Sequence, residues 1–117
     1  MNIESYRDYC LSKKGVSESF PFNESTLVMK VLTKMFALTD LMSEFMISLK
    51  CDPEKAVELR ERYKYIIPAG HFNKKHWNTI IIDDSIPDQF IIDLIDHSYD
   101  LVISNMTKIN QNRLSEL

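Results

Sequence analysis

The sequence predicts one α+β domain with its elements in the order α-β-β-β-α-β-α. Three runs of alternating apolar residues follow one another between residues 27 and 49, and segments with helical apolar spacing lie on both sides of them. Period-two alternation is typical of half-buried strands, and apolar residues at i, i+3 and i+7 are typical of an amphipathic helix. The chain has 117 residues, of which 44% are hydrophobic, so one core can form without disulfides or a structural metal.

The first helix is predicted near the N-terminus. Ile3, Tyr6 and Cys10 recur at helical spacing, and Asn2 precedes them as a capping residue. Gly15 follows at a place that suits a left-handed residue after a helix. Residues 17–19, Ser-Glu-Ser, are expected to form a turn.

Three strands are predicted next, over about residues 27–31, 34–38 and 45–49. Only Leu32 and Thr33 separate the first two strands, which indicates a tight hairpin. The connection between the second and third strands is expected to expose Leu41 and Met42. The simplest arrangement of three such strands is an antiparallel meander.

A second helix and a fourth strand follow. Asp52 and Pro53 are typical of a helix start, because Asp accepts from free amides and Pro suits the first helical position. The helix is expected to bury Ala56, Leu59 and Tyr63. The β-branched content of residues 77–82 predicts a strand.

The last helix is predicted to be long. Ser85 and Asp88 have capping-box spacing around Pro87, so the helix is expected to start near residue 86. One apolar stripe continues to Ile109, with Asp93, Asp96 and Asp100 among the residues on the other side. Residues 110–117 are expected to fray, so the core of the single domain is predicted over about residues 3–109.

Charge is distributed unevenly along the chain. The totals are 14 Lys and Arg against 17 Asp and Glu, a net charge of −3 that disfavours a protein devoted to holding phosphates. Residues 55–76, however, carry six basic and two acidic side chains, whereas residues 77–117 carry two basic and seven acidic ones. A local basic surface is therefore compatible with the acidic total.

The two cysteines, Cys10 and Cys51, form no CxxC pair, so we expect a reducing compartment, the cytoplasm. The charged residues of the first eight positions disfavour a signal peptide. Nothing in the sequence approaches the roughly 20 apolar residues of a membrane helix, and membrane association is not expected.

Six separated motifs occur in a recognisable order. They are FPF at 20–22, TLV at 26–28, KMFAL at 34–38, LKCDP at 49–53, PAGHFNKKHWNT at 68–79 and LIDHSY at 94–99. With these motifs the chain resembles the bacterial MmcQ/YjbR-like family over about residues 3–107. One departure is Gly70, where the resemblance leads us to expect an aromatic residue.

The resemblance implies a CyaY-like, or frataxin-like, fold in which helices pack on one face of an antiparallel sheet. It also implies a predicted DNA-binding role of the double-wing type. A fold by itself does not establish an activity. Iron handling is not expected, because Glu4 and Asp8 on the first helix alternate with Arg7 and precede Lys13 and Lys14.

The best candidate site is the segment 71–78. Its residues are His71, Phe72, Asn73, Lys74, Lys75, His76, Trp77 and Asn78. Lysines can contact phosphates, Asn can contact a base edge, and Trp or Phe can stack on a base. The alternative is structural: Trp77 is a core aromatic, the two Asn residues fix the loop, and the two lysines are solvated.

Other basic residues are candidates to extend this surface. Arg60, Arg62 and Lys64 do so if the second helix runs beside segment 71–78; otherwise they form a solvated helix face. Lys30, Lys34 and Lys50, with the Leu41-Met42 tip, form a possible DNA-binding wing. Lysines that protect an exposed sheet edge are the alternative explanation.

We expect neither catalysis, nor a metal, nor a cofactor. The sequence contains no GxSxG motif and no Gly-rich phosphate loop, and the five-residue separation of His71 and His76 is not a standard metal spacing. The leading hypothesis is weak DNA binding. A protein-binding adaptor is the first alternative, and the second is a binder of a small anionic ligand beside His71, His76 and Lys74.

Overall fold

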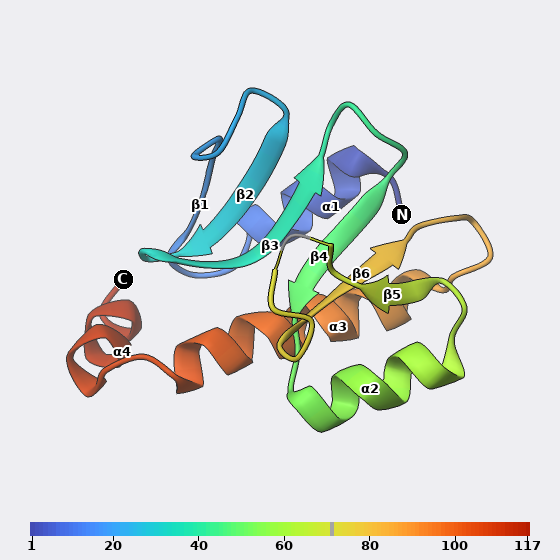
Figure 1. The fold of residues 1–117 in the computed structure, drawn as a ribbon. Helices are drawn as coiled ribbons and strands as arrows, with labels where there is room; N and C mark the ends of the chain where they lie inside the picture. The colour runs from blue at the N-terminus through green and yellow to red at the C-terminus, as the bar shows by residue number, and fades with distance from the viewer. Residues whose placement is uncertain (71) are drawn as a thin grey trace.

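The structure, a computed structural model, describes residues 1–70 and 72–117, and these residues form four helices and six strands (Figure 1). In chain order the elements are α1 (Ile3–Leu11), β1 (Val16–Ser19), β2 (Thr26–Val31), β3 (Lys34–Asp40), β4 (Met46–Lys50), α2 (Pro53–Arg62), β5 (Ile66–Pro68), β6 (Trp77–Ile81), α3 (Asp88–Ser104) and α4 (Lys108–Ser115). The α+β fold class is confirmed.

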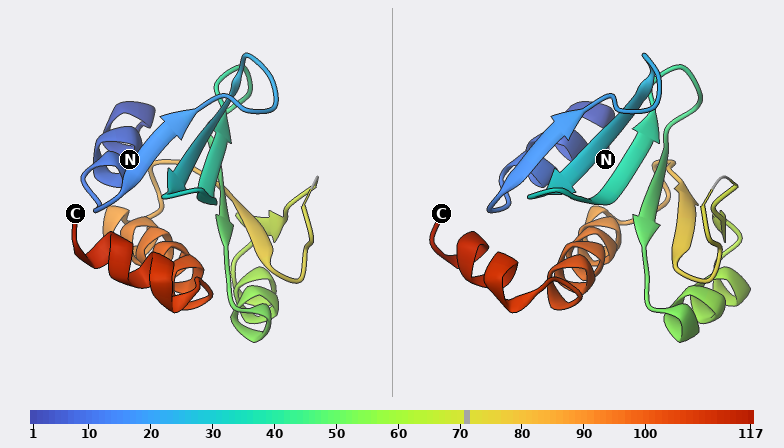
Figure 2. Two further views of the ribbon diagram at one scale, coloured as in Figure 1. Left: turned by 90° about the vertical axis from the view of Figure 1, so that its left-hand side faces the viewer. Right: turned by 60° about the vertical axis from the view of Figure 1, so that its left-hand side comes forward.

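The strands form one antiparallel sheet in the order β1-β2-β3-β4-β6-β5. Helix α1 contacts β1, α3 contacts β2, β3 and β4, and α2 contacts β5 and β6 (Figure 2). These helices lie on one face, as the resemblance implied. We call the other face of the sheet the helix-free face.

The main core lies between the sheet and the helices. Alternate strand residues such as Met29, Ala37, Ile47 and Ile80 point into it and are buried. The long helix α3 is fixed to the sheet by Ser98, whose Oγ donates to the Phe36 carbonyl at 2.5 Å and accepts from the Lys50 amide at 2.9 Å. A buried hydroxyl that both donates and accepts has no unmet hydrogen bond, so it costs little in the core.

Strands β3 and β4 separate along their length. Their register covers two pairs, Ala37 with Leu49 and Leu38 with Ser48. Beyond these pairs, Thr39 Oγ1 donates to the Met46 carbonyl at 2.6 Å, so a side chain replaces the main-chain donor. The separation leaves a hollow on the helix-free face.

Two strands were not predicted. Residues 17–19 were expected to form a turn, but they belong to β1, which pairs with β2 from Val16↔Val31 to Ser19↔Val28. Strand β5 lies between the predicted second helix and the predicted strand at 77–82, where no strand was expected, and it pairs with β6. Both are short edge strands with little alternation in their own residues, and pairing with a neighbour fixes them.

The helix starts are partly confirmed. Asn2 caps α1 in a capping box with Ser5, and Asp52 caps α2. The capping box predicted for the last helix is wrong: α3 begins at Asp88 after Pro87 without a side-chain cap. Ser85 instead donates its amide to Asp83 Oδ1 at 2.8 Å, which closes an Asx turn.

The C-terminal end of the chain is also corrected. Helix α3 stops at Ser104 rather than near residue 109. Residues 108–115, of which all from 110 onward were expected to fray, form α4 with Thr107 as its cap. Leu114 is buried in the main core and packs beside Gly15, which has a φ of 76°. A buried anchor therefore holds a helix whose own sequence is mostly polar.

Candidate functional site

The loop that carries most of segment 71–78 packs over the helix-free face. Trp77, Val28, Leu38 and Ala69 form a second buried cluster there, and Phe72 packs against it. The Phe72 and Trp77 ring centroids are 5.3 Å apart, and Trp77 is 7% exposed. Trp77 therefore does not present a ring face to a base, and its contacts favour the structural interpretation. His71 lies outside the described residues.

Asn78 is also a structural residue. Its side chain is buried at the helix side of β6, where Nδ2 donates to the Ala56 carbonyl at 3.2 Å and Oδ1 accepts from Arg60 at 2.7 Å. Arg60 donates at 3.0 Å to the Lys74 carbonyl as well. The pair Arg60–Asn78 thus joins α2, β6 and the loop, and Arg60 Nη1 is engaged within the fold.

Asn73 and His76 shape the same loop. Asn73 Oδ1 accepts from the Lys75 amide at 2.9 Å, and the Asn73 carbonyl accepts from the His76 amide. The His76 carbonyl accepts from the Cys51 amide at 2.7 Å, which holds the loop beside the end of β4. These contacts present Lys74 and Lys75 outward, and both are exposed.

Four lysines gather at this end of the sheet, which we call the basic end: Lys34, Lys50, Lys74 and Lys75. Lys50 pairs with Trp77 in the ladder, next to the loop, and Lys34 and Lys50 line one hollow of about 290 Å³ beside the end of α3. The ion pairs found within the described residues are Met1–Asp88, Arg7–Glu18 and Lys13–Asp96. None of them involves a lysine of the basic end.

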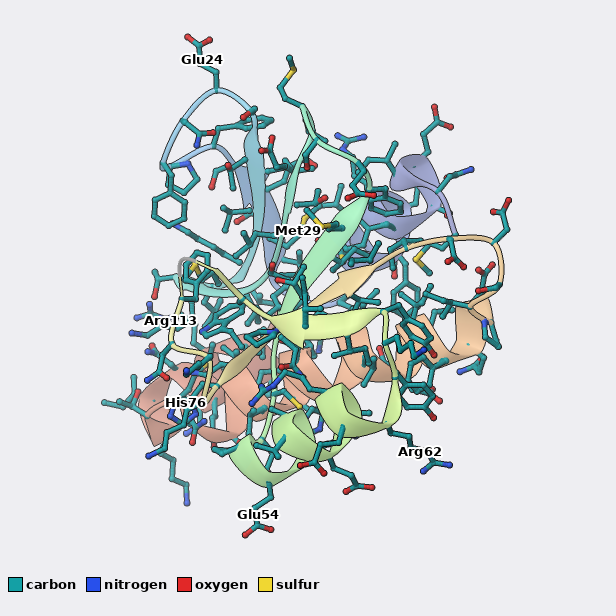
Figure 3. The ribbon with its side chains drawn as sticks, turned by 45° about the vertical axis from the view of Figure 1, so that its right-hand side comes forward. Glu24, Met29, Glu54, Arg62, His76 and Arg113 are labelled. Carbon is teal, nitrogen blue, oxygen red and sulfur yellow. The ribbon has the colours of Figure 1, made fainter. Side chains whose placement is uncertain are left out.

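Two predicted extensions of this surface are not found. Arg62 ends α2, whereas His76 lies beside Cys51 at the start of that helix, so about 15 Å of helix separates them. Figure 3 places Arg62 and His76 on opposite sides of the molecule, and Lys64 follows Arg62 in the chain. Arg62 instead lies over the Tyr63 ring.

The predicted wing is divided as well. Lys34 begins β3 and Leu41 follows its end, so roughly 20 Å of strand separates that lysine from the apolar tip. The tip lies beside the β1–β2 loop, since the Leu41 amide donates to the Ser25 carbonyl at 2.8 Å. Phe20, Phe22, Leu41 and Met42 are all exposed on these two loops.

A groove occupies the helix-free face where β3 and β4 separate, and its volume is about 780 Å³. Its floor carries the hydroxyls of Ser48 and Thr79, which are 2.7 Å apart in a hydrogen bond, and Thr39 also borders it. Phe22 and Phe72 stand on its rim with ring centroids 6.4 Å apart. The second buried cluster lies between the groove and the basic end.

The described residues contain no cluster of three or more His, Cys, Asp or Glu that would suit a metal ion. Within the same residues, no helix combines the length and apolar character needed to cross a bilayer.

Comparison with known proteins identifies the family of this chain. The family model YjbR matches residues 11–101. The chain belongs to the YjbR family. It is 31% identical to the uncharacterized protein YjbR of Escherichia coli K12 over 118 residues, covering all of both chains. It is 32% identical to the uncharacterized protein YbdF of Escherichia coli O157:H7, over 95% of this chain and 92% of the relative.

Solved structures of similar proteins support the fold of this YjbR-family chain. The crystal structure of Deinococcus radiodurans protein DR2400, described as a DUF419 domain, matches with a TM-score of 0.90 and 38% identity, covering 97% of this chain and 88% of that one. A Pseudomonas syringae protein matches with a TM-score of 0.75 and 27% identity, over 86% and 98% of the two chains.

The groove was not predicted from the sequence, although polar residues of its floor follow a visible pattern. Ser48 and Thr79 occupy strand positions that alternate with core residues such as Ile47 and Ile80, so an outward polar row was visible in principle. Its signal was weak because short polar residues on outward positions are ordinary in a sheet with one solvated face. These polar residues form the floor of a groove only because β3 and β4 separate beside them.

Proposed function

We propose that this YjbR-family chain binds duplex DNA weakly, without catalysis, through the basic end. The observation that carries the proposal is the gathering of Lys34, Lys50, Lys74 and Lys75 at one end of the sheet, outside the ion pairs of the described residues. Ammonium groups that bind phosphates release condensed counterions, which is the main source of non-specific affinity for DNA.

The contacts available at the basic end favour DNA binding that does not depend on the base sequence. Lysines on phosphates position a protein but do not read bases. Trp77 and Asn78 are buried, and the Asn73 side chain already accepts from the Lys75 amide. The residues that would have read bases are therefore engaged within the fold.

Charge determines the orientation and the strength of the complex. Asp93, Asp96 and Asp100 lie on α3, in the helix layer, and repel phosphate from that side. DNA is thus expected to approach the basic end from the side away from these carboxylates. The net charge of −3 limits the long-range attraction, so we expect the affinity to be low at physiological salt.

The test is fluorescence anisotropy of a labelled 20-base-pair duplex at several salt concentrations. We expect binding at low salt that weakens as salt rises. The double variant Lys74→Glu/Lys75→Glu should bind more weakly and reduce the slope of log K against log salt by about 2, since each phosphate contact contributes about 0.9. The double variant Arg62→Glu/Lys64→Glu is the matched control, because it makes the same change of charge at the far end of α2.

Equal losses in both double variants would show a response to total charge alone and would contradict the assignment to the basic end. If the wild-type chain does not bind even at low salt, the DNA proposal fails. That result would favour a protein partner instead, at the exposed apolar residues of the β1–β2 and β3–β4 loops.

A further inference from the structure

We propose that the groove of the helix-free face is a separate ligand site, and that it takes a small, ring-containing apolar molecule that is neutral or positively charged. The site is distinct from the basic end in position and in charge. It is also unlike the anionic-ligand site considered from the sequence, which was expected beside His71, His76 and Lys74.

The size of the groove fits such a molecule. Its volume of about 780 Å³ lies within the roughly 300–1,000 Å³ typical of small-molecule sites. The groove exists because the β3–β4 ladder stops after Leu38↔Ser48, while Thr39 Oγ1 satisfies the Met46 carbonyl. The hydrogen bonds of the sheet therefore maintain the hollow, and no unpaired strand edge is needed to form it.

Aromatic and aliphatic side chains provide most of the binding surface. Phe72 stands between Phe22 and Trp77, with centroid distances of 6.4 Å and 5.3 Å, so three rings form a row across the face. Phe22 is 58% exposed on the rim, and Leu38 and Met46 lie in the lining. A ring placed against Phe22 would bury apolar surface that is now exposed to water, and aromatic pairs favour offset or edge contacts.

The polar lining selects the charge of the ligand. Asp40 is the one charged residue among the lining residues that the structure describes, and its Oδ1 accepts from the Met42 amide at 2.9 Å, which fixes the carboxylate at the rim. A fixed carboxylate beside an apolar groove repels anions and attracts cations. The hydroxyls of the floor accept hydrogen bonds from a ligand N–H or O–H.

Gly70 provides a position at which the groove can be blocked. It lies in the lining, and a Cβ added there would have no heavy atom within 4 Å. Gly70→Trp therefore adds a large side chain at the lining of the groove without displacing the fold. Ile109→Trp is the matched control, since Ile109 is 73% exposed on α4, away from the sheet.

The experiment uses two fluorescent probes with the same aromatic frame. N-phenyl-1-naphthylamine is neutral, and 8-anilinonaphthalene-1-sulfonate is anionic. We expect the neutral probe to bind the wild-type chain, and the sulfonate to bind roughly fivefold more weakly because of Asp40. Asp40→Asn should bring the two affinities within about twofold, and amide NMR shifts should appear at Thr39, Ser48 and Thr79.

The variants test whether the probe binds in the groove. Gly70→Trp should weaken the neutral probe at least tenfold while Ile109→Trp leaves it unchanged, and circular dichroism checks that both are folded. Phe22→Ala, at an exposed position, should also weaken the probe. Failure of the wild-type chain to bind the neutral probe overturns the proposal, as does equal binding by Gly70→Trp, equal affinity for the sulfonate, or NMR shifts confined to Leu41 and Met42.

Discussion

Asn78 shows at the scale of one residue how a polar side chain in a promising motif is used within the fold. Its surface is 3% exposed, and both ends of its amide are hydrogen-bonded, to Arg60 and to the Ala56 carbonyl. A buried amide that reaches two elements stabilises their arrangement because each partner would otherwise be left without a hydrogen bond. The same residue in an exposed loop would be available to a ligand.

We therefore expect Asn78→Ala to lower the free energy of unfolding by about 2 kcal/mol, since it leaves the Ala56 carbonyl and Arg60 without their partner. Asn73→Ala is the matched control. It removes one exposed hydrogen bond to the Lys75 amide and should cost about 1 kcal/mol or less. Urea denaturation of the two variants gives the comparison. Equal stabilities would contradict the structural role of Asn78, particularly if Asn78→Ala also weakened DNA binding.

At the scale of elements, the contact between α2 and α3 depends on protonation. The Asp52 amide, at the cap of α2, donates to His97 Nε2 on α3 at 3.2 Å. Burial and then the positive charge of Lys55 lower the pKa of His97 from its ordinary value of 6.5, although Asp52 and Asp100 oppose them. A protonated Nε2 can no longer accept from the amide, so acid weakens this junction.

The pH dependence follows from the direction of that shift. Because folded His97 holds its proton less tightly than the unfolded chain does, unfolding takes up a proton below about pH 6.5. The free energy of unfolding should therefore fall as the pH falls from about 7 to 5. His97→Gln retains an acceptor but does not titrate, so its stability should change less over this range.

Urea titrations of both proteins at pH 7, 6 and 5 provide the measurement. The other histidines are common to the two proteins, so the difference isolates His97. Glu18, whose pKa Arg7 lowers, and Asp83, whose pKa hydrogen bonds from Ser85 lower, act at more acidic pH. Parallel pH profiles for wild type and variant would refute the role of His97.

At the scale of the whole molecule, β6 joins the two apolar clusters. Ile80 faces the main core, and Trp77 belongs to the cluster of the helix-free face. Strand β6 also pairs with β4 from Met46↔Ile81 to Lys50↔Trp77, so it connects the N-terminal strands with the C-terminal part of the chain. The radius of gyration of 13.7 Å is close to the roughly 13 Å expected for one domain of this length.

This connection predicts one cooperative unfolding transition. Trp77 fluorescence reports on the helix-free face, and far-ultraviolet circular dichroism reports largely on the helices of the other face. The two signals should give the same urea midpoint. An earlier midpoint for Trp77 would show that the loop between β5 and β6 detaches before the core unfolds.

The sequence by itself determined the elements whose pattern is local. The caps at Asn2 and Asp52, the tight turn at Leu32-Thr33, the three alternating strands and the apolar stripe of α3 follow from neighbouring residues, and the structure confirms them. Local propensity and periodicity are sufficient there because each element presents its own apolar face to the core. The family motifs extended this to the arrangement of helices on one face.

Tertiary structure decided the rest. Strands β1 and β5 exist because neighbouring strands offer them hydrogen bonds, and α4 is held because Leu114 reaches the core. Segment 71–78 looked uniform in sequence, yet packing buried Trp77 and Asn78 and left Lys74 and Lys75 exposed. Which side of a strand faces a helix, and where two strands separate into a groove, depends on contacts between residues far apart in the chain, and no local pattern records them.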